Sequence, residues 1–544
     1  MNARTLADKQ RTAKGAGSVG LLAIGLLLSS IAMLVAGDSL VVKIYAMIFL
    51  WLCAAMSVRS DIAHPYLWFA GPYLIYAIAA PTLAAMGTLP KFIWMGAPLD
   101  ELDYSVVLDL CFVGLVVFLV VVGPRRVRSP KVSPEQIRRL FPGVTPVFIL
   151  FGILVAIAVL QPLISGIDDK RTLVLEGTFI TRLSYHGTLL MCVSYFLYYL
   201  YQKGKITQVF LITIVMIVLS LFIISIVGQR SALYRVIIIT GLLYHIAYKP
   251  VSVKMLAVAV VTGLLLNSVL GVVKMSFYAA DGLSEEAFAL ADLSALNPEL
   301  MREPPLMRGL KIGLTIALRS EPMTVGTNLA KLVERVPGEF DYLYGKSLYM
   351  DTFRAMLPGA LLDFDDAGTE STQILFNKTF FEHNYYRGSG IGFTLVGEGY
   401  YNGGVFGVVV LFVLWGFAMR KIYDWGGRSL FGLLFMVNFA PIAIMSNRTD
   451  LSAPIGQGIK HLLLPMLLII FISHLVEKSK RQRAARQLSL PRRGSGRKAL
   501  DAADHEPCLS AGDGGLEVIV GSVRSFGGKS GDATRRKYRI PPAP

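Results

Sequence analysis

Residues 206–240 read ITQVFLITIVMIVLSLFIISIVGQRSALYRVIIIT. The first part of this stretch, residues 206–227, contains no charged side chain. An apolar run of about 20 residues is long enough to cross the hydrocarbon core of a bilayer as a helix. Because lipid offers no partners for backbone polar groups, such a run satisfies them best in helical form. The stretch therefore predicts a membrane-spanning helix at 206–227. A second apolar run begins at 231, with Arg230 directly before it and Arg235 near its beginning.

Similar apolar runs recur along the chain, which has 544 residues, 54% hydrophobic and 17% charged. A soluble protein of this length carries about a quarter charged residues. The first run is too long for a signal peptide and has no clear small-residue cleavage site. We therefore expect an all-α polytopic membrane protein with about 12 transmembrane helices. The predicted spans are 18–36, 39–57, 65–86, 104–123, 144–163, 184–201, 206–227, 231–248, 253–273, 403–419, 429–446 and 461–477.

Lysine and arginine collect in alternate short loops, which gives the expected orientation. With a cytoplasmic N-terminus, the basic inside loops are 124–139, 201–205, 248–254 and 419–428, and the chain ends on the same side. The predicted organisation is therefore a cytoplasmic N-terminus (1–17), spans one to nine (18–273), a long outer loop (274–402) and spans ten to twelve (403–477). A basic cytoplasmic tail (478–544), rich in Arg, Gly, Ser and Pro, is predicted to be disordered.

The formal net charge of +16 lies largely on the inside loops and the tail. Such charge orients the chain and attracts anionic membrane lipids, so nucleic acid is not an expected partner. The four cysteines have no partners at metal-ligand spacing. The acidic stretch DFDDAGTE (363–370) lacks the spacing and closing glutamate of a calcium-binding EF-hand loop, which favours a solvated turn. Neither a metal nor a cofactor is expected.

Several arginines fall on the predicted outer side, although lysine and arginine are normally in excess in cytoplasmic loops. They are Arg182, Arg230, Arg235 and Arg448. Ionisable groups at membrane depth usually face a cavity and have a function, whereas snorkelling to lipid phosphates is the alternative. On one helix, positions five apart point about 140° away from each other. We therefore rank Arg230, which lies beside Gly228, above Arg235, for which snorkelling is the alternative.

The segment GEGYYNGGVFG (397–407) lies where the long outer loop meets span ten. Its glycines permit close approach of a helix or ligand, and its tyrosines suit stacking on sugar faces. A glutamate at a desolvated membrane edge is suited to proton transfer. Glu398 is therefore a candidate base, and the alternative is that it stabilises the beginning of a helix.

The order of these motifs resembles the Wzy-type O-antigen or oligosaccharide repeat-unit polymerases of bacterial inner membranes. The resemblance covers residues 20–477 and rests on G-x-R before an apolar span (Gly228–Arg230), then Y-G-K-S (344–347) and L-P (357–358) in the long loop. It rests further on the G-E-x-Y-x-N-x-G-x-x-G pattern (397–407) and on an arginine in the last outer loop. Members often carry an arginine after the loop proline, where this chain has Gly359, and Arg354 or Arg387 is the expected substitute.

The resemblance implies a GT-C-like fold in the bacterial inner membrane, with a periplasmic loop between spans nine and ten. It implies a glycosyltransferase that polymerises undecaprenyl-diphosphate-linked oligosaccharides into O-antigen, capsule or exopolysaccharide. A chain-length regulator and a flippase are further expected partners. The implied base is Glu398 or His383, and the implied sugar-binding residues are Tyr400, Tyr401 and Asn402. The implied diphosphate-binding residues are Arg230, Arg235, Arg182, Arg354, Arg387 and Arg448.

Two other functions remain open from the sequence. An O-antigen ligase shares the leaving group and the long loop, but His383 does not fit the spacing between loop histidine and glycine that is typical of ligases. A 12-span secondary transporter should show two similar halves, whereas the long loop here lies outside, between spans nine and ten.

Overall fold

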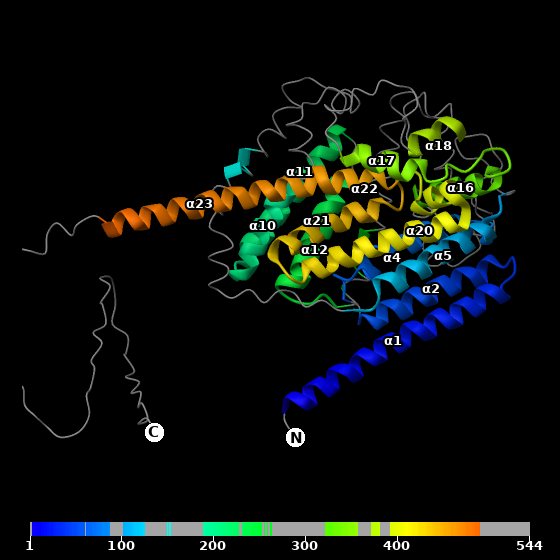
Figure 1. Ribbon diagram of the computed structural model, residues 1–544, viewed down its shortest axis with the longest axis horizontal. Coiled ribbons are helices and arrows are strands. Elements are labelled where there is room, and N and C mark those ends of the chain that lie inside the picture. Colours follow the sequence, from blue (N-terminus) through cyan, green and yellow to red (C-terminus); the bar gives the residue numbers. More distant parts are fainter. Residues whose placement is uncertain are drawn as a thin grey trace, which may run out of the picture. The chain divides into compact units, whose positions relative to one another are not determined.

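The computed structural model describes residues 3–59, 61–87, 102–125, 149–150, 152–153, 189–227, 231–252, 255, 258, 262–263, 321–356, 372–380 and 392–489. Regular secondary structure in these residues is helical throughout (Figure 1). The helices are α1 (Ala3–Val35), α2 (Leu40–Ser57), α3 (Pro65–Trp68), α4 (Ala70–Ala85), α5 (Tyr104–Val122), α10 (Leu189–Gln202), α11 (Ile206–Val227), α12 (Ser231–Ala247), α16 (Glu321–Arg335), α17 (Lys346–Met356), α18 (Thr372–Phe380), α20 (Leu395–Gly426), α21 (Leu430–Met445), α22 (Ser452–Gln457), the π-helix η5 (Gly458–Leu463) and α23 (Leu464–Ser489).

Within the described residues, six helices are long and apolar enough to cross a membrane. Four shorter apolar segments lie within α10, α11, α12 and α21, namely Leu189–Gln202, Ile206–Leu221, Leu233–Ala247 and Leu430–Met445. These helices coincide with ten of the twelve predicted spans, so the chain is an all-helical, multi-pass membrane protein. The other two predicted spans, 144–163 and 253–273, lie almost entirely outside the described residues. The total of twelve therefore stays a prediction.

At three places the helices extend beyond the predicted spans. The helix that contains span ten begins at Leu395 rather than at 403, and residues 452–460, between the predicted spans eleven and twelve, are helical. Pro454 lies in the first turn of α22, where its missing N–H costs no helical hydrogen bond. Helix α23 continues to Ser489 through the basic segment 477–486, which was assigned to a disordered tail. Lysine, arginine, glutamine and alanine are good helix formers, which explains this extension.

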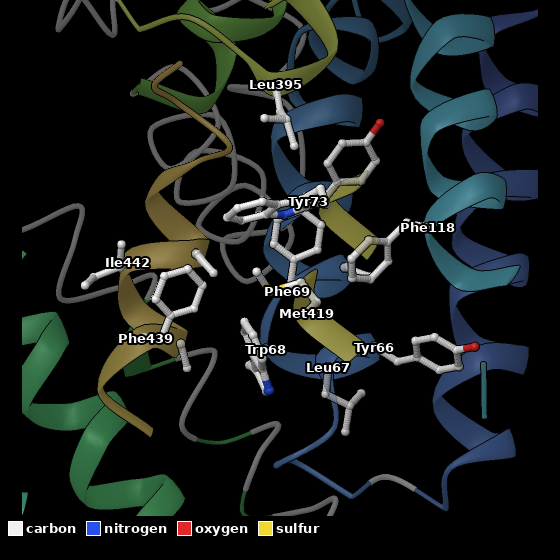
Figure 2. Close-up of a cluster of buried hydrophobic side chains, with 14 of the residues drawn as sticks. Tyr66, Leu67, Trp68, Phe69, Tyr73, Phe118, Leu395, Met419, Phe439 and Ile442 are labelled. Carbon is white, nitrogen blue, oxygen red and sulfur yellow. The ribbon is translucent and has the colours of Figure 1, made fainter. Parts of the chain in front are cut away.

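Aromatic side chains from α4, α5, α20 and α21 form the core of the bundle (Figure 2). Phe69, at the beginning of α4, lies 4.5 Å from Phe118 and 6.0 Å from Trp415 between ring centroids, and Trp415 in turn lies 6.1 Å from Phe439. Edge-on and tilted aromatic pairs at these separations add stability beyond the area that they bury. These contacts hold α20 between α5 and α21.

Helix α16 belongs to the predicted outer loop and packs on α4, α5 and α20. A Cβ built on Gly326 would lie 3.0 Å from the Cβ of Ala80, which shows how closely α16 approaches α4. The side-chain amide of Asn328 donates to the carbonyl of Gly392 at 2.7 Å. Helix α16 thus fixes the segment that leads into α20.

Asp61, between α2 and α3, joins the ends of two other spans. Its Oδ1 lies 2.9 Å from Nε2 of His245 in α12, and its Oδ2 accepts a 3.3 Å hydrogen bond from Tyr423 in α20. Because the Val251 N–H donates to Nδ1 of His245, Nε2 carries the proton that faces Asp61. Burial raises the pKa of Asp61, but the hydrogen bonds from His245 and from the Ala63 N–H help to hold that pKa below its ordinary value. Asp61 is therefore ionised at neutral pH.

Contacts such as these bring several predicted inside loops to one end of the bundle. Tyr201, in the loop 201–205, stacks on Tyr248 of the loop 248–254 at 6.1 Å between centroids. Arg420, in the loop 419–428, donates to the carbonyl of Val121 at the end of α5. Segments that the charge pattern assigned to the same side of the membrane thus contact each other. Which side is cytoplasmic stays a prediction.

Replacing Asp61 by alanine is expected to lower the stability of the protein by about 1–3 kcal/mol, because His245 and Tyr423 lose a buried acceptor. Thermal unfolding in detergent measures this effect. Asp38→Ala, at an exposed position between α1 and α2, is the matched control. Equal melting temperatures for the two variants would show that Asp61 does not hold these spans together.

Candidate functional site at the beginning of helix α20

The beginning of α20 is a short helical segment followed by a break. Thr394 caps it, its Oγ1 accepting a 2.7 Å hydrogen bond from the Gly397 N–H. The helix is interrupted at Gly403 and Gly404, and Gly404 has φ +61°, a left-handed conformation that favours glycine. A Cβ at Gly404 would also lie 3.0 Å from the hydroxyl of Tyr342. The glycine-rich motif therefore codes for a broken membrane helix.

Two motifs that carried the family resemblance meet at this break. Ser347, from Y-G-K-S, donates from its hydroxyl to Oδ1 of Asn402 at 3.0 Å. The Asn402 amide lies 2.7 Å from both the Ser347 Oγ and the Glu398 carbonyl, to which it donates. The backbone N–H of Leu343 donates to the carbonyl of Tyr401 at 2.9 Å. The loop motif thus docks directly on the broken helix.

Replacing Gly407 by alanine is expected to destabilise the protein by about 1–3 kcal/mol, because the added Cβ would overlap the carbonyl oxygen of Gly399. Gly403→Ala is the matched control, since a Cβ there meets nothing within 4 Å and its φ of 178° is extended backbone. Thermal unfolding of both variants measures the difference. If both melt like the wild type, the break does not require close approach of its two halves.

Glu398 lies one turn inside α20 and reaches the loop 446–451 that joins α21 to α22. Its side chain is fully buried, and its Oε2 accepts a 2.6 Å hydrogen bond from the Leu451 N–H. Two residues before α20, the Phe393 N–H donates to the carbonyl of Arg448 at 2.9 Å. Because Thr394 provides the cap, Glu398 instead ties the beginning of α20 to the loop that carries Arg448.

Asp450 fixes the same loop from another direction. Its Oδ2 accepts a 3.1 Å hydrogen bond from the Gln373 N–H at the beginning of α18, and its Oδ1 accepts from Ser452 and from the Ala453 N–H in α22. The loop 446–451 therefore connects α18, α20, α21 and α22 and holds the backbone of Arg448 in one place.

Arg235, in the second turn of α12, points into the bundle and is only 6% exposed, so it does not snorkel. Its Nη2 donates to Oε1 of Gln457 in α22 at 2.9 Å and lies 3.3 Å from Sδ of Met445 in α21. Both groups are uncharged. Within the described residues, Nε has no hydrogen-bond partner and no carboxylate lies within ion-pair distance of this guanidinium.

In the part of the chain that is described, the charge that acts on Arg235 has the same sign as Arg235 itself. Arg448 interacts with it electrostatically as a second guanidinium, and His461 of η5 lies in the field of both Arg235 and Lys460. Helix α12, the loop 446–451 and η5 thus bring Arg235, Arg448 and His461 towards one region, beside Gln457 of α22. A π-helical turn such as η5 is uncommon and is frequently found at functional sites. This arrangement is suited to binding an anion.

Gln457 and His461 were not predicted as site residues. Gln457 lies between the predicted spans 429–446 and 461–477, and His461 is the first residue of the latter span. If residues 452–463 are read as helical, positions 457 and 461 fall one turn apart on one face. This four-residue spacing is the sequence signal from which Gln457 and His461 could have been predicted as neighbours.

Other predicted site residues have less definite positions. Arg182, Arg230, His383 and Arg387 lie outside the described residues, and only the backbone of Arg354 is described, within α17. Tyr401 and Asn402 are 4% and 5% exposed, whereas Tyr400 is half-buried and donates from its hydroxyl to the Val336 carbonyl. Of the three predicted sugar-binding residues, Tyr400 therefore has the most accessible ring.

Comparison with known families supports the resemblance seen in the sequence. Residues 371–480 match the family model described as O-antigen polysaccharide polymerase Wzy. The resemblance to the Wzy family is thereby confirmed. No curated protein and no solved structure matches the chain. The Wzy match extends from α18 into α23 and therefore includes Glu398, Arg448, Gln457 and His461. It supports, in general terms, polymerisation of lipid-linked O-antigen repeat units in a membrane.

Proposed function

We propose that the protein joins undecaprenyl-diphosphate-linked oligosaccharide repeat units at the periplasmic face of the bacterial inner membrane. The observation that carries this proposal is Arg235, a buried guanidinium that lies in the electrostatic field of Arg448 and has no acidic partner in the part of the chain described. Removing such a charge from water costs several kcal/mol unless an opposite charge compensates it. A bound anion supplies that compensation.

The chemistry of the two arginines favours a diphosphate as this anion. A guanidinium donates two parallel N–H groups to phosphate oxygens and keeps its charge in a dry environment. The Wzy match supports a lipid-linked oligosaccharide as substrate, and the diphosphate of such a lipid is presented at the membrane interface. Arg235 and Arg448 would hold it, and Gln457 would orient Arg235 through the hydrogen bond that it accepts.

The reaction breaks the bond between the anomeric carbon of the growing chain and the diphosphate oxygen. A new bond forms between that carbon and a hydroxyl oxygen at the non-reducing end of the incoming unit. Undecaprenyl diphosphate leaves with the bonding electron pair, and the hydroxyl proton passes to a base. The two arginines stabilise the negative charge that develops on the leaving diphosphate.

Glu398 is assigned a positioning role in this proposal. Its carboxylate is fully buried and bonded to the backbone of the loop that carries Arg448. A general base must reach the proton that it accepts within hydrogen-bond distance. His383, on the outer loop, remains the proposed base, and Arg230, Arg182, Arg354 and Arg387 remain proposed further contacts to the diphosphate. A GT-C-like arrangement, cytoplasmic termini, a chain-length regulator and a flippase also belong to the proposal.

Deleting the gene in its native host distinguishes a polymerase from a ligase, because the two deletions leave different lipid-linked products. Loss of a polymerase is expected to leave lipid-linked single repeat units, because no unit is joined to the next. Loss of a ligase leaves long polymer on its lipid, because only the final transfer is missing. Mass spectrometry of extracted lipid-linked oligosaccharides distinguishes the two, and accumulated long polymer would contradict the proposed function.

A further inference from the structure

Three tyrosine rings form a continuous row beside the break in α20. The rings of Tyr344 and Tyr342 lie 6.3 Å apart between centroids at 80°, and those of Tyr342 and Tyr400 lie 6.1 Å apart at 76°. Tyr344 is 79% exposed, whereas Tyr342 and Tyr400 are half-buried. This tyrosine row therefore leads from the surface of the outer segment to the helix that carries Glu398.

Two further exposed aromatic side chains follow on α17. Tyr349 and Phe353 are each 63% exposed and stand four positions apart, so they share one face of this helix. Exposed aromatic rings that are contiguous usually mark a binding surface. Because the Leu343 N–H and Ser347 bond to α20, the row is held against the broken helix rather than on a free loop.

We propose that Tyr344, Tyr342 and Tyr400 form a binding track for the oligosaccharide part of the substrate, extended on the outside by Tyr349 and Phe353. The proposal rests on the proposed function and adds a glycan site to it. Aromatic faces pack against the C–H faces of sugar rings, while phenol hydroxyls bond to sugar hydroxyls. Carbohydrate is favoured over lipid because α17 also carries Lys346, Asp351 and Arg354 within eleven residues.

Binding of delipidated polysaccharide, released from the native polymer by mild acid, tests the track in the purified protein. Tyr344→Ala is expected to weaken binding about tenfold, by losing one stacking contact worth roughly 1–1.5 kcal/mol. Tyr344→Phe should bind nearly as well as wild type because it keeps the ring. Tyr45→Ala removes a 67% exposed tyrosine from α2, outside the row, and should leave binding unchanged.

The chain-length distribution provides the second measurement. Cells with Tyr344→Ala are expected to make polymer of shorter modal length, at normal protein level, while the Phe and Tyr45 variants keep the wild-type length. Wild-type binding and length in Tyr344→Ala would overturn the track. Unchanged glycan binding combined with weaker association of the variant with liposomes would assign the row to the membrane interface instead. Failure of the proposed function is distinguishable, because the deletion strain would then accumulate long polymer on its lipid.

Discussion

Replacing Arg235 by lysine is expected to reduce polymer formation about 30- to 1,000-fold while the protein stays inserted and abundant. Lysine keeps the positive charge but lacks the planar pair of N–H groups that holds two phosphate oxygens. Losing one preorganised contact to the leaving diphosphate costs roughly 2–4 kcal/mol of transition-state stabilisation, which gives that loss of rate. Lipid-linked single repeat units should accumulate, and their ratio to long polymer measures the effect.

Arg428→Lys is the matched control for this experiment. Arg428 is exposed after α20, at the end of that helix opposite Glu398, so its replacement should leave polymer unchanged. Full-length polymer at the normal rate from Arg235→Lys, and also from Arg235→Ala, would show that the buried guanidinium has no part in the reaction.

Glu398→Ala is expected to reduce polymer formation at least 100-fold. The Leu451 N–H loses its buried acceptor, which costs about 1–3 kcal/mol, and the loop that carries Arg448 is no longer tied to α20. Displacement of a catalytic contact by about 1 Å is enough for a loss of that size. Polymer length on gels and the melting temperature of the purified variant measure the two effects.

The Glu398→Gln variant distinguishes a role of Glu398 in positioning the loop 446–451 from a role as the base that accepts a proton. Its side-chain oxygen still accepts from the Leu451 N–H, so this variant is expected to keep polymer formation within about tenfold of wild type. Glu339→Ala, at an exposed position after α16, serves as the control for removal of a carboxylate. A glutamine variant as inactive as the alanine variant, with an unchanged melting temperature, would identify Glu398 as the base.

Most of the fold that is described follows from local properties of the sequence. Apolar runs of about 20 residues locate the spans. The charge pattern assigns the loops 201–205 and 248–254 to the same side of the membrane, and Tyr201 and Tyr248 of these loops contact each other. The errors arose where a local signal was ambiguous. Pro454 indicates a break in the interior of a helix but is compatible with its first turn, and the basic segment 477–486 indicates solvent without indicating disorder.

The site was predicted in part, because its residues come from segments far apart in the chain. The outer arginines and Glu398 were found from their placement at membrane ends. That Arg235 is buried depends on Gln457 and Met445, more than 200 positions away, which no local pattern reveals. Helical phase together with the neighbouring Gly228 ranked Arg230 above Arg235, and Arg230 lies outside the described residues.

The most direct test of the account is equilibrium binding of undecaprenyl diphosphate to the purified protein and to its Arg235→Lys variant. A charge-assisted hydrogen bond contributes about 1.5–3 kcal/mol, so the variant should bind the lipid roughly ten- to a hundredfold more weakly than wild type. Equal dissociation constants for the two proteins would contradict the claim that Arg235 holds the diphosphate.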